Sequence, residues 1–228
     1  MDKETDELIA EFVGEHGIAN LQNWRPAYNI RPTDPVPVVI ESAKQGQRVR
    51  RLESARWALV PSFSKQLKTA HPLFNARAEE AASKPSFAPS VRSRRAIIPA
   101  TGYYEWQSIG AAKTPYFIRL PGELMGLAGL YSWWADPTKD KSDETRWHLT
   151  ATILTSDAVQ TLEHIHDRNP VPIPRDFWDQ WLDPTVVGDQ GLLDEAVRAA
   201  LPVAESLEFY EVGPVKDDGP QLIEPVAH

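Results

Sequence analysis

Residues 71–107 read HPLFNARAEEAASKPSFAPSVRSRRAIIPATGYYEWQ, and the interpretation of the whole chain starts from this stretch. It holds an Asn-Ala-Arg turn at 75–77, a cluster of arginines that ends at Arg95, and an apolar segment with one carboxylate, Glu105, between two aromatic residues. A carboxylate among aromatic side chains is costly to bury, so it is usually paired, lies at a strand end, or has a raised pKa and a catalytic role. The stretch therefore predicts a site around Glu105, with a structural ion pair to a nearby arginine as the alternative.

The composition sets limits on the class of protein. The chain has 228 residues, 42% of them hydrophobic, and no cysteine, so disulfides, thiolate metal ligands and a Cys nucleophile are excluded within this sequence. This length allows one large or two small domains with a substantial core. No apolar run approaches the roughly 20 residues of a membrane span, and the acidic N-terminus does not resemble a signal peptide. We expect no membrane partner and a cytoplasmic location.

The charge is distributed unevenly along the chain. Residues 44–119 contain 14 lysines and arginines against four acids, a formal charge of +10. Because the whole chain carries −8, the remainder carries −18. This asymmetry permits a basic groove for nucleic acid on an acidic body, although solvated strand and loop faces explain it equally well.

Hydrophobic periodicity and turn residues predict an α+β fold. The apolar, alternating segments predict strands over residues 36–41, 47–59, 95–99, 102–107, 115–120, 124–134, 147–155 and 207–212. The amphipathic segments predict helices over residues 4–15 (closed by Gly17), 76–84, 157–165 (with a capping box from Asp157 to Gln160), 177–182 and 192–201. Turns are expected at 45–46 and at Gly110.

The order of these elements indicates the architecture. Most strands are joined as hairpins and the helices flank them, which predicts a single domain over residues 1–212 with a distorted, largely antiparallel, barrel-like sheet. Residues 213–228 form a Pro-rich tail that we expect to be loosely held.

Two histidines, His164 and His166, follow the predicted helix 157–165. A metal site would need further ligands in a recognisable spacing, and none is evident, so we expect neither a metal nor another cofactor. An imidazole titrates near neutral pH, which makes a single histidine here a candidate acid or base. The structural alternative is a histidine that interacts with the last carbonyls of a helix.

Several other side chains are candidate contacts to nucleic acid. Asn75 suits a local turn or a hydroxyl or phosphate ligand, and Arg77 suits a phosphate contact or a surface charge. Thr155 closes a strand, where ordinary packing is the alternative. Trp57 and Phe63 flank a loop near basic residues, an arrangement that suits stacking on single-stranded bases, although core packing is preferred for Trp57.

A series of motifs then occurs in order over roughly residues 24–182. They read WRPAYNIRPTDPVPVV, RWALVPSF, FNARAE, KPSF, RRAIIPATGYYEWQ, PYFI, AGLYSWW, TILT and IHDRNPVPI. Together they closely resemble the SRAP family (SOS response-associated peptidase), the abasic-site processing proteins of DNA repair.

The resemblance implies a function. It implies a monomeric α+β domain with a distorted antiparallel barrel that binds single-stranded DNA and captures abasic sites covalently. In the family, removal of the first Met exposes a Cys whose amine forms a Schiff base with the sugar aldehyde and whose thiol closes a thiazolidine. The peptidase label is then the removal of that Met from the protein's own chain.

The resemblance also implies roles for individual residues. Asn75 would hold the abasic sugar, Glu105 would shuttle protons, and His166 would assist as acid or base. The DNA contacts would come from the remaining candidates, Arg77, Thr155, Trp57, Phe63 and Arg168.

The chain departs from the family at its start. The family begins Met-Cys-Gly-Arg, whereas this chain begins Met-Asp-Lys, so a shortened N-terminus or a misplaced start is expected. Two alternatives remain open: a non-catalytic paralogue that binds single-stranded DNA, and a residual abasic-site lyase that uses another amine together with Glu105. Smaller departures are Ala58, Phe63 and Asn169, where the family usually has Gly, Trp and Met.

Overall fold

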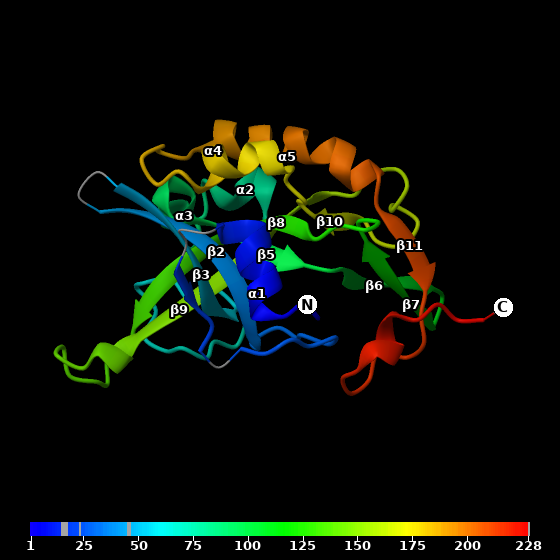
Figure 1. Ribbon diagram of the computed structural model, residues 1–228, viewed down its shortest axis with the longest axis horizontal. Helices are drawn as coiled ribbons and strands as arrows, with labels where there is room; N and C mark the ends of the chain where they lie inside the picture. The colour runs from blue at the N-terminus through cyan, green and yellow to red at the C-terminus, as the bar shows by residue number, and fades with distance from the viewer. Residues whose placement is uncertain (15–17, 23, 45–46, 228) are drawn as a thin grey trace.

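The computed structural model describes residues 1–14, 18–22, 24–44 and 47–227. Within these ranges eight strands form a large sheet and three form a small one (Figure 1). The large sheet contains β1 (Ile18–Asn20), β2 (Pro35–Lys44), β3 (Gln47–Trp57), β4 (Asn75–Arg77), β5 (Arg95–Ala100), β8 (Met125–Ala135), β9 (Trp147–Asp157) and β10 (Arg168–Pro170). The small sheet contains β6 (Tyr103–Ile109), β7 (Ala112–Arg119) and β11 (Glu208–Glu211).

The helices of these residues are short except for one. They are α1 (Thr5–Leu8) with a π-helical turn (Ile9–Val13), α2 (Ala78–Ala81), α3 (Ala88–Ser93), α4 (Trp178–Leu182) and α5 (Gln190–Glu205), with 3₁₀ turns at Glu144–Arg146, Arg175–Phe177 and Pro220–Ile223. In Figure 1, α2, α4 and α5 lie along one side of the large sheet.

The large sheet is partly closed. Its order is β1-β3-β2-β5-β8-β9-β10, and a short parallel pairing of β3 with β9 brings the two sides together. Most pairings are antiparallel, and the parallel ones join β1 to β3 and both β3 and β4 to β9. The predicted α+β fold with a barrel-like, largely antiparallel sheet is therefore confirmed.

The core has two parts, because successive side chains of a strand point to opposite faces. One face packs against the helices, and Trp178 and Trp181 of α4 lie in that cluster. The other face forms a second cluster that extends to the small sheet through Ile118 and Tyr103. Burial of both faces explains why β5 and β8 read as nearly continuous apolar runs.

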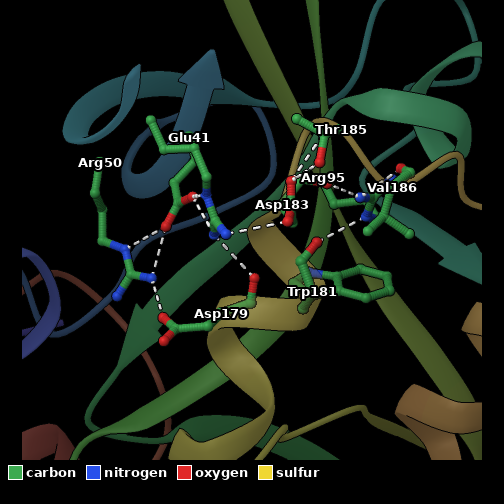
Figure 2. A network of polar contacts seen from close by, with 9 residues as sticks. Glu41, Arg50, Arg95, Asp179, Trp181, Asp183, Thr185 and Val186 are labelled. Atoms are coloured by element: carbon green, nitrogen blue, oxygen red, sulfur yellow. Dashed lines mark hydrogen bonds and ion pairs between the residues drawn. The ribbon is translucent and has the colours of Figure 1, made fainter. Parts of the chain in front are cut away.

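Arg95 is a structural residue. It is only 2% exposed, and its guanidinium donates hydrogen bonds to the carbonyl oxygens of Trp181 (2.7 Å), Val91 (2.9 Å), Val186 (3.0 Å) and Asp183. Figure 2 shows the acceptors Trp181, Asp183 and Val186 converging on it from the end of α4 and the loop after it, and Val91 belongs to α3. The residue therefore fixes α4 and this loop against β5.

A second part of this network joins the β2–β3 hairpin to α4. Glu41, 5% exposed, accepts hydrogen bonds from Arg48 (2.7 Å) and Arg50 (2.8 Å). Arg48 also pairs with Asp183 (3.0 Å) and Arg50 with Asp179 (2.5 Å) (Figure 2). Together with Arg95, these arginines are three of the 14 basic residues of 44–119, so a part of that positive charge is engaged within the fold and is not available to a basic groove.

Three predicted helices differ in the structure. The N-terminal helix ends at Gly14, which has a φ of 76°, and Gly17 and the turn at 45–46 lie outside the described residues. The predicted helix 157–165 is wrong. β9 continues through Asp157, which pairs with Arg168 and is not a cap, and the segment after it forms turns. The predicted helix 76–84 is confirmed only over α2.

The C-terminal segment also differs, because residues 213–227 are packed on the domain. Asp218 Oδ1 accepts hydrogen bonds from the backbone N–H groups of Tyr28 (2.7 Å) and Asn29 (3.1 Å). Leu222 is buried, and Tyr210 donates to the carbonyl oxygen of Ile223 at 2.9 Å. The expectation of a loosely held tail is therefore wrong, because its contacts are made to residues distant in sequence.

None of the helices in the described ranges has the length and apolar character needed to cross a membrane.

Candidate functional site

Three short strand segments bring four of the predicted site residues together. β4 lies parallel to β9, with Asn75 opposite Ile153 and Arg77 opposite Thr155. β10 lies antiparallel on the other side of β9 at the same end, and Pro170 is opposite Thr155. Arg168 begins β10. Asn75, Arg77, Thr155 and Arg168 therefore gather around one end of β9.

The alternation of side chains decides which of these residues share a face. Register partners point to the same side of a sheet, so Asn75 and Arg77 lie on the face of Thr155, and buried Ala76 points to the other face. Asn75 and Arg77 are exposed, whereas Thr155 is 7% exposed. The face thus offers an amide and a guanidinium to solvent above a buried hydroxyl.

Arg168 acts as a clamp at this end of β9. Its guanidinium donates to Glu79 of α2 (2.8 and 3.1 Å), to Asp157 (2.6 Å) and to the Thr155 carbonyl oxygen (2.7 Å). Burial alone would raise the pKa of Glu79, but the bonds from Arg168 outweigh it and lower that pKa. The predicted DNA contact Arg168 is therefore already engaged with the protein, and it ties β10 to β9 and α2.

Glu105 lies on β6 of the small sheet, opposite Tyr116 of β7, and is half-buried. Burial raises the pKa of its carboxyl, a nearby His166 counteracts this, and Asp167 adds to it. A carboxyl whose pKa is raised toward neutrality can exchange protons under physiological conditions. Glu105 and His166 are therefore close enough for their charges to interact.

The Nδ1 side of the His166 ring is surrounded by polar groups. Its Nδ1 lies 3.0 Å from the backbone nitrogen of Arg168 and 3.2 Å from the Arg168 carbonyl oxygen. Asp167 Oδ1 lies 3.1 Å from the same nitrogen. One of these neighbours is a donor and two are acceptors, so they hold the ring in place without fixing which nitrogen carries the proton. Because two of the neighbours belong to Arg168, the clamp also orients His166.

The small sheet is joined to the turns that carry the histidines. Gln107 of β6 donates from Nε2 to the carbonyl oxygen of His164 at 2.9 Å. Tyr103 packs in the second core cluster, which also contains Ile153 of β9 and Ile165. The small sheet therefore packs against the same hydrophobic cluster as β9 and the turns that precede His166. The His164 ring lies 5.1 Å from Phe209 and belongs to the hydrophobic contacts of β11.

The predicted aromatic contacts fall in two places. Trp57 is partly buried and donates from Nε1 to the carbonyl oxygen of Phe74 at 2.9 Å, with the two rings edge to face at 6.2 Å. It adjoins Asn75 through this contact. Phe63 is 66% exposed. The carbonyl oxygen of its neighbour Ser64 accepts a hydrogen bond from Trp134 Nε1 at 2.8 Å, and Trp134 of β8 is the register partner of His148 on β9. Five residues of β9 separate His148 from Ile153, roughly 17 Å, so Phe63 does not join the cluster.

Sequence reasoning missed three residues of this region. Phe74 is 37% exposed and precedes Asn75. An aromatic residue directly before a polar turn was the sequence signal that could have identified it. Glu79 and Asp157 hold the clamp, but their partner is distant in sequence, so no local signal exists. No group of three His, Cys, Asp or Glu side chains in the described part of the chain could hold a metal ion.

Comparisons with known proteins identify the family. The sequence model of the SOS response associated peptidase (SRAP) family matches residues 1–215, so the chain belongs to the SRAP family. It is similar to the abasic site processing protein YoqW of Bacillus subtilis, with 32% identity over 227 residues that cover 97% of this chain and 95% of YoqW. It is also similar to the abasic site processing protein HMCES of Gallus gallus, with 31% identity, covering 89% of this chain and 67% of HMCES.

Solved structures share the fold. A Bordetella bronchiseptica protein superposes with a TM-score of 0.71 at 19% identity, covering 93% of this chain and 97% of that one. A Bacteroides thetaiotaomicron protein superposes with a TM-score of 0.67 at 24% identity, covering 86% and 82% of the two chains. At these identities the likeness concerns the fold alone.

Proposed function

We propose that this protein processes abasic sites in single-stranded DNA, with Glu105 as the group that moves protons during reaction at the sugar aldehyde. The observation that supports the proposal is a half-buried Glu105 carboxyl that interacts with the charge of His166, which in turn contacts Arg168 where β10 pairs with the end of β9. The names of YoqW and HMCES as abasic site processing proteins support the same substrate.

The chemistry begins with the open form of the abasic sugar, which has an aldehyde. A primary amine adds to the carbonyl carbon, and loss of water gives a Schiff base. Protonated Glu105 donates to the leaving oxygen, and the carboxylate formed takes the proton that the nitrogen loses. His166 supports the same transfers as an acid or base. Asn75 holds the sugar through its side-chain amide.

The fate of the Schiff base depends on the neighbouring groups. Where a Cys supplies the amine, its thiol adds to the C=N carbon and closes a stable thiazolidine without any oxidant. The chain contains no cysteine, so with any other primary amine as the nucleophile the reaction would reach only the imine, from which elimination of the 3′ phosphate is the lyase outcome. Preceded by Met-Cys-Gly-Arg, and after removal of that Met, it would form the crosslink.

The single-stranded DNA would contact the exposed groups of the same face. Arg77 would meet a phosphate, and the exposed part of Phe74 beside Trp57 would meet a base. This arrangement alone would also suit a module that binds DNA without chemistry, which is the second candidate function because Phe74 and Trp106 (42% exposed) present aromatic surface.

The test is trapping on a single-stranded oligonucleotide with one abasic site. We expect a borohydride-dependent protein–DNA adduct with the chain as it is. With Met-Cys-Gly-Arg placed before Met1, we expect a heat-stable adduct without borohydride. The matched control is a tetrahydrofuran site, which lacks the aldehyde and must give neither product. Equal, salt-dependent binding to both oligonucleotides with no adduct from either folded protein would favour the binding module and contradict the proposal.

A further inference from the structure

The hydroxyl of Tyr103 is an unexplained polar group next to the site. It is cut off from solvent and has no hydrogen-bond partner among the described residues. An unpaired buried hydroxyl lowers the stability of a fold, so such a group calls for an explanation in function. A phenylalanine would fill the same space without this cost.

The strand geometry places Tyr103 on the same face of β6 as Glu105. Tyr103 and Glu105 are two apart on β6, so their side chains leave the same face, with Ile118 and Tyr116 of β7 as their register partners. Burial raises the pKa of Tyr103, and the neighbouring Glu105 charge adds to this effect. The hydroxyl therefore stays protonated and is a permanent donor beside a carboxylate.

Other titratable groups also surround Glu105. Tyr116 faces it from β7 with a second phenol hydroxyl, and Glu211 of β11 lies opposite Tyr116. From the turn before β10, the Asp167 charge raises the pKa of Glu105, and the Nδ1 of His166 is engaged by Arg168 and Asp167. The His164 ring lies 5.1 Å from that of Phe209. The Tyr103 hydroxyl differs from these groups because it is cut off from solvent and has no partner among the described residues.

We propose that the Tyr103 hydroxyl donates a hydrogen bond to the Glu105 carboxylate during the reaction and so acts as a positioning residue that orients this group and stabilises its charged form. An effect of Tyr103 on the reaction rate rests on the proposed function, whereas its effect on the pKa of Glu105 does not. Small rotations of the two side chains bring donor and acceptor together, and the bond is re-formed each time Glu105 gives up its proton.

The experiment compares wild type with Tyr103→Phe by NMR titration of the Glu105 carboxyl carbon. Since a bond to the charged form lowers a pKa, its removal should move the midpoint to higher pH. On abasic single-stranded DNA, the acid limb of the rate–pH profile should move the same way, with a rate near neutral pH about tenfold lower. The variant should unfold at an equal or higher denaturant concentration, because an unpaired buried hydroxyl is gone.

Two further proteins make the result decisive. Tyr210→Phe removes a hydroxyl that is bound to Ile223, so it should lower stability without moving the Glu105 titration. 3-Fluorotyrosine at position 103, a stronger donor, should move the titration to lower pH. Unchanged Glu105 midpoints in both Tyr103 proteins would overturn the inference. Moved midpoints in a protein that gives no adduct with abasic DNA would support it and contradict the proposed function alone.

Discussion

Arginine serves opposite purposes in two regions of this molecule. Around β5 and α4, Arg95 and its neighbours Arg48 and Arg50 are consumed by carbonyl oxygens and carboxylates (Figure 2). At the end of β9, Arg77 is exposed, whereas Arg168 is paired with Glu79 and Asp157. The difference teaches that a count of basic residues does not locate a DNA-binding face, because partners distant in sequence decide which charges reach the surface.

The largest expected effect separates the first region from the second. Arg95→Met leaves several buried carbonyl oxygens without a donor, so it should lower the free energy of unfolding by about 3–5 kcal/mol. Chemical denaturation measures this loss. The rate of adduct formation per folded molecule should be unchanged. Arg92→Met, on the exposed side of α3, is the control and should change neither quantity. If folded Arg95→Met forms the adduct more slowly, the first region also contributes to the reaction.

The next test concerns the clamp that Arg168 forms with Glu79. Glu79→Gln weakens its bond to Arg168, but the Glu79 side chain is 48% exposed, so the loss of stability should stay below about 1 kcal/mol. Because Arg168 orients His166 through its backbone, the rate should fall more than the stability does. Single-turnover trapping beside urea unfolding checks this. If the rate falls only as much as the loss of stability predicts, the clamp has no role in positioning His166.

The contrast between exposed and engaged arginines appears in the salt dependence of DNA binding. Arg77→Ala should reduce the slope of log affinity against log salt by about 1 for single-stranded DNA, since one phosphate contact is lost. Arg48→Ala should leave this slope unchanged, because Arg48 is paired with Glu41 and Asp183. Fluorescence anisotropy at several salt concentrations measures both. Equal slopes for Arg77→Ala and wild type would exclude Arg77 as a phosphate contact.

The smallest expected effects concern the pH dependence of stability. The contributions of the Glu105 and Glu79 carboxyls to the free energy of unfolding should change in opposite directions as the pH falls. The pKa of Glu105 is raised, so its charge destabilises the fold, and wild type should gain stability over Glu105→Gln as pH falls through that raised value. The pKa of Glu79 is lowered, so its contribution is present above the ordinary value and is lost as pH falls through the lowered one. Unfolding curves from pH 3 to 8 test both signs, and two differences of the same sign would contradict the account.

The sequence predicted the hairpins and the barrel-like sheet because these depend on local alternation and turns, such as Gly110, which has a φ of 59°. It failed at residues 157–165, where a helical pattern was overridden by the pairing of Asp157 with Arg168. It identified Asn75 and Glu105 as candidates through a motif. It could not predict that Arg95 is buried or that Arg168 is clamped, because both depend on contacts between distant segments.

The central claim is that Glu105 moves the protons of the aldehyde reaction. The most direct measurement is the single-turnover rate of borohydride-trapped adduct formation on abasic single-stranded DNA for wild type and Glu105→Gln, with both proteins shown to be folded. The account predicts a rate lower by about 10²–10⁴-fold in Glu105→Gln, the usual contribution of a positioned acid or base. Equal rates in the two folded proteins would contradict it.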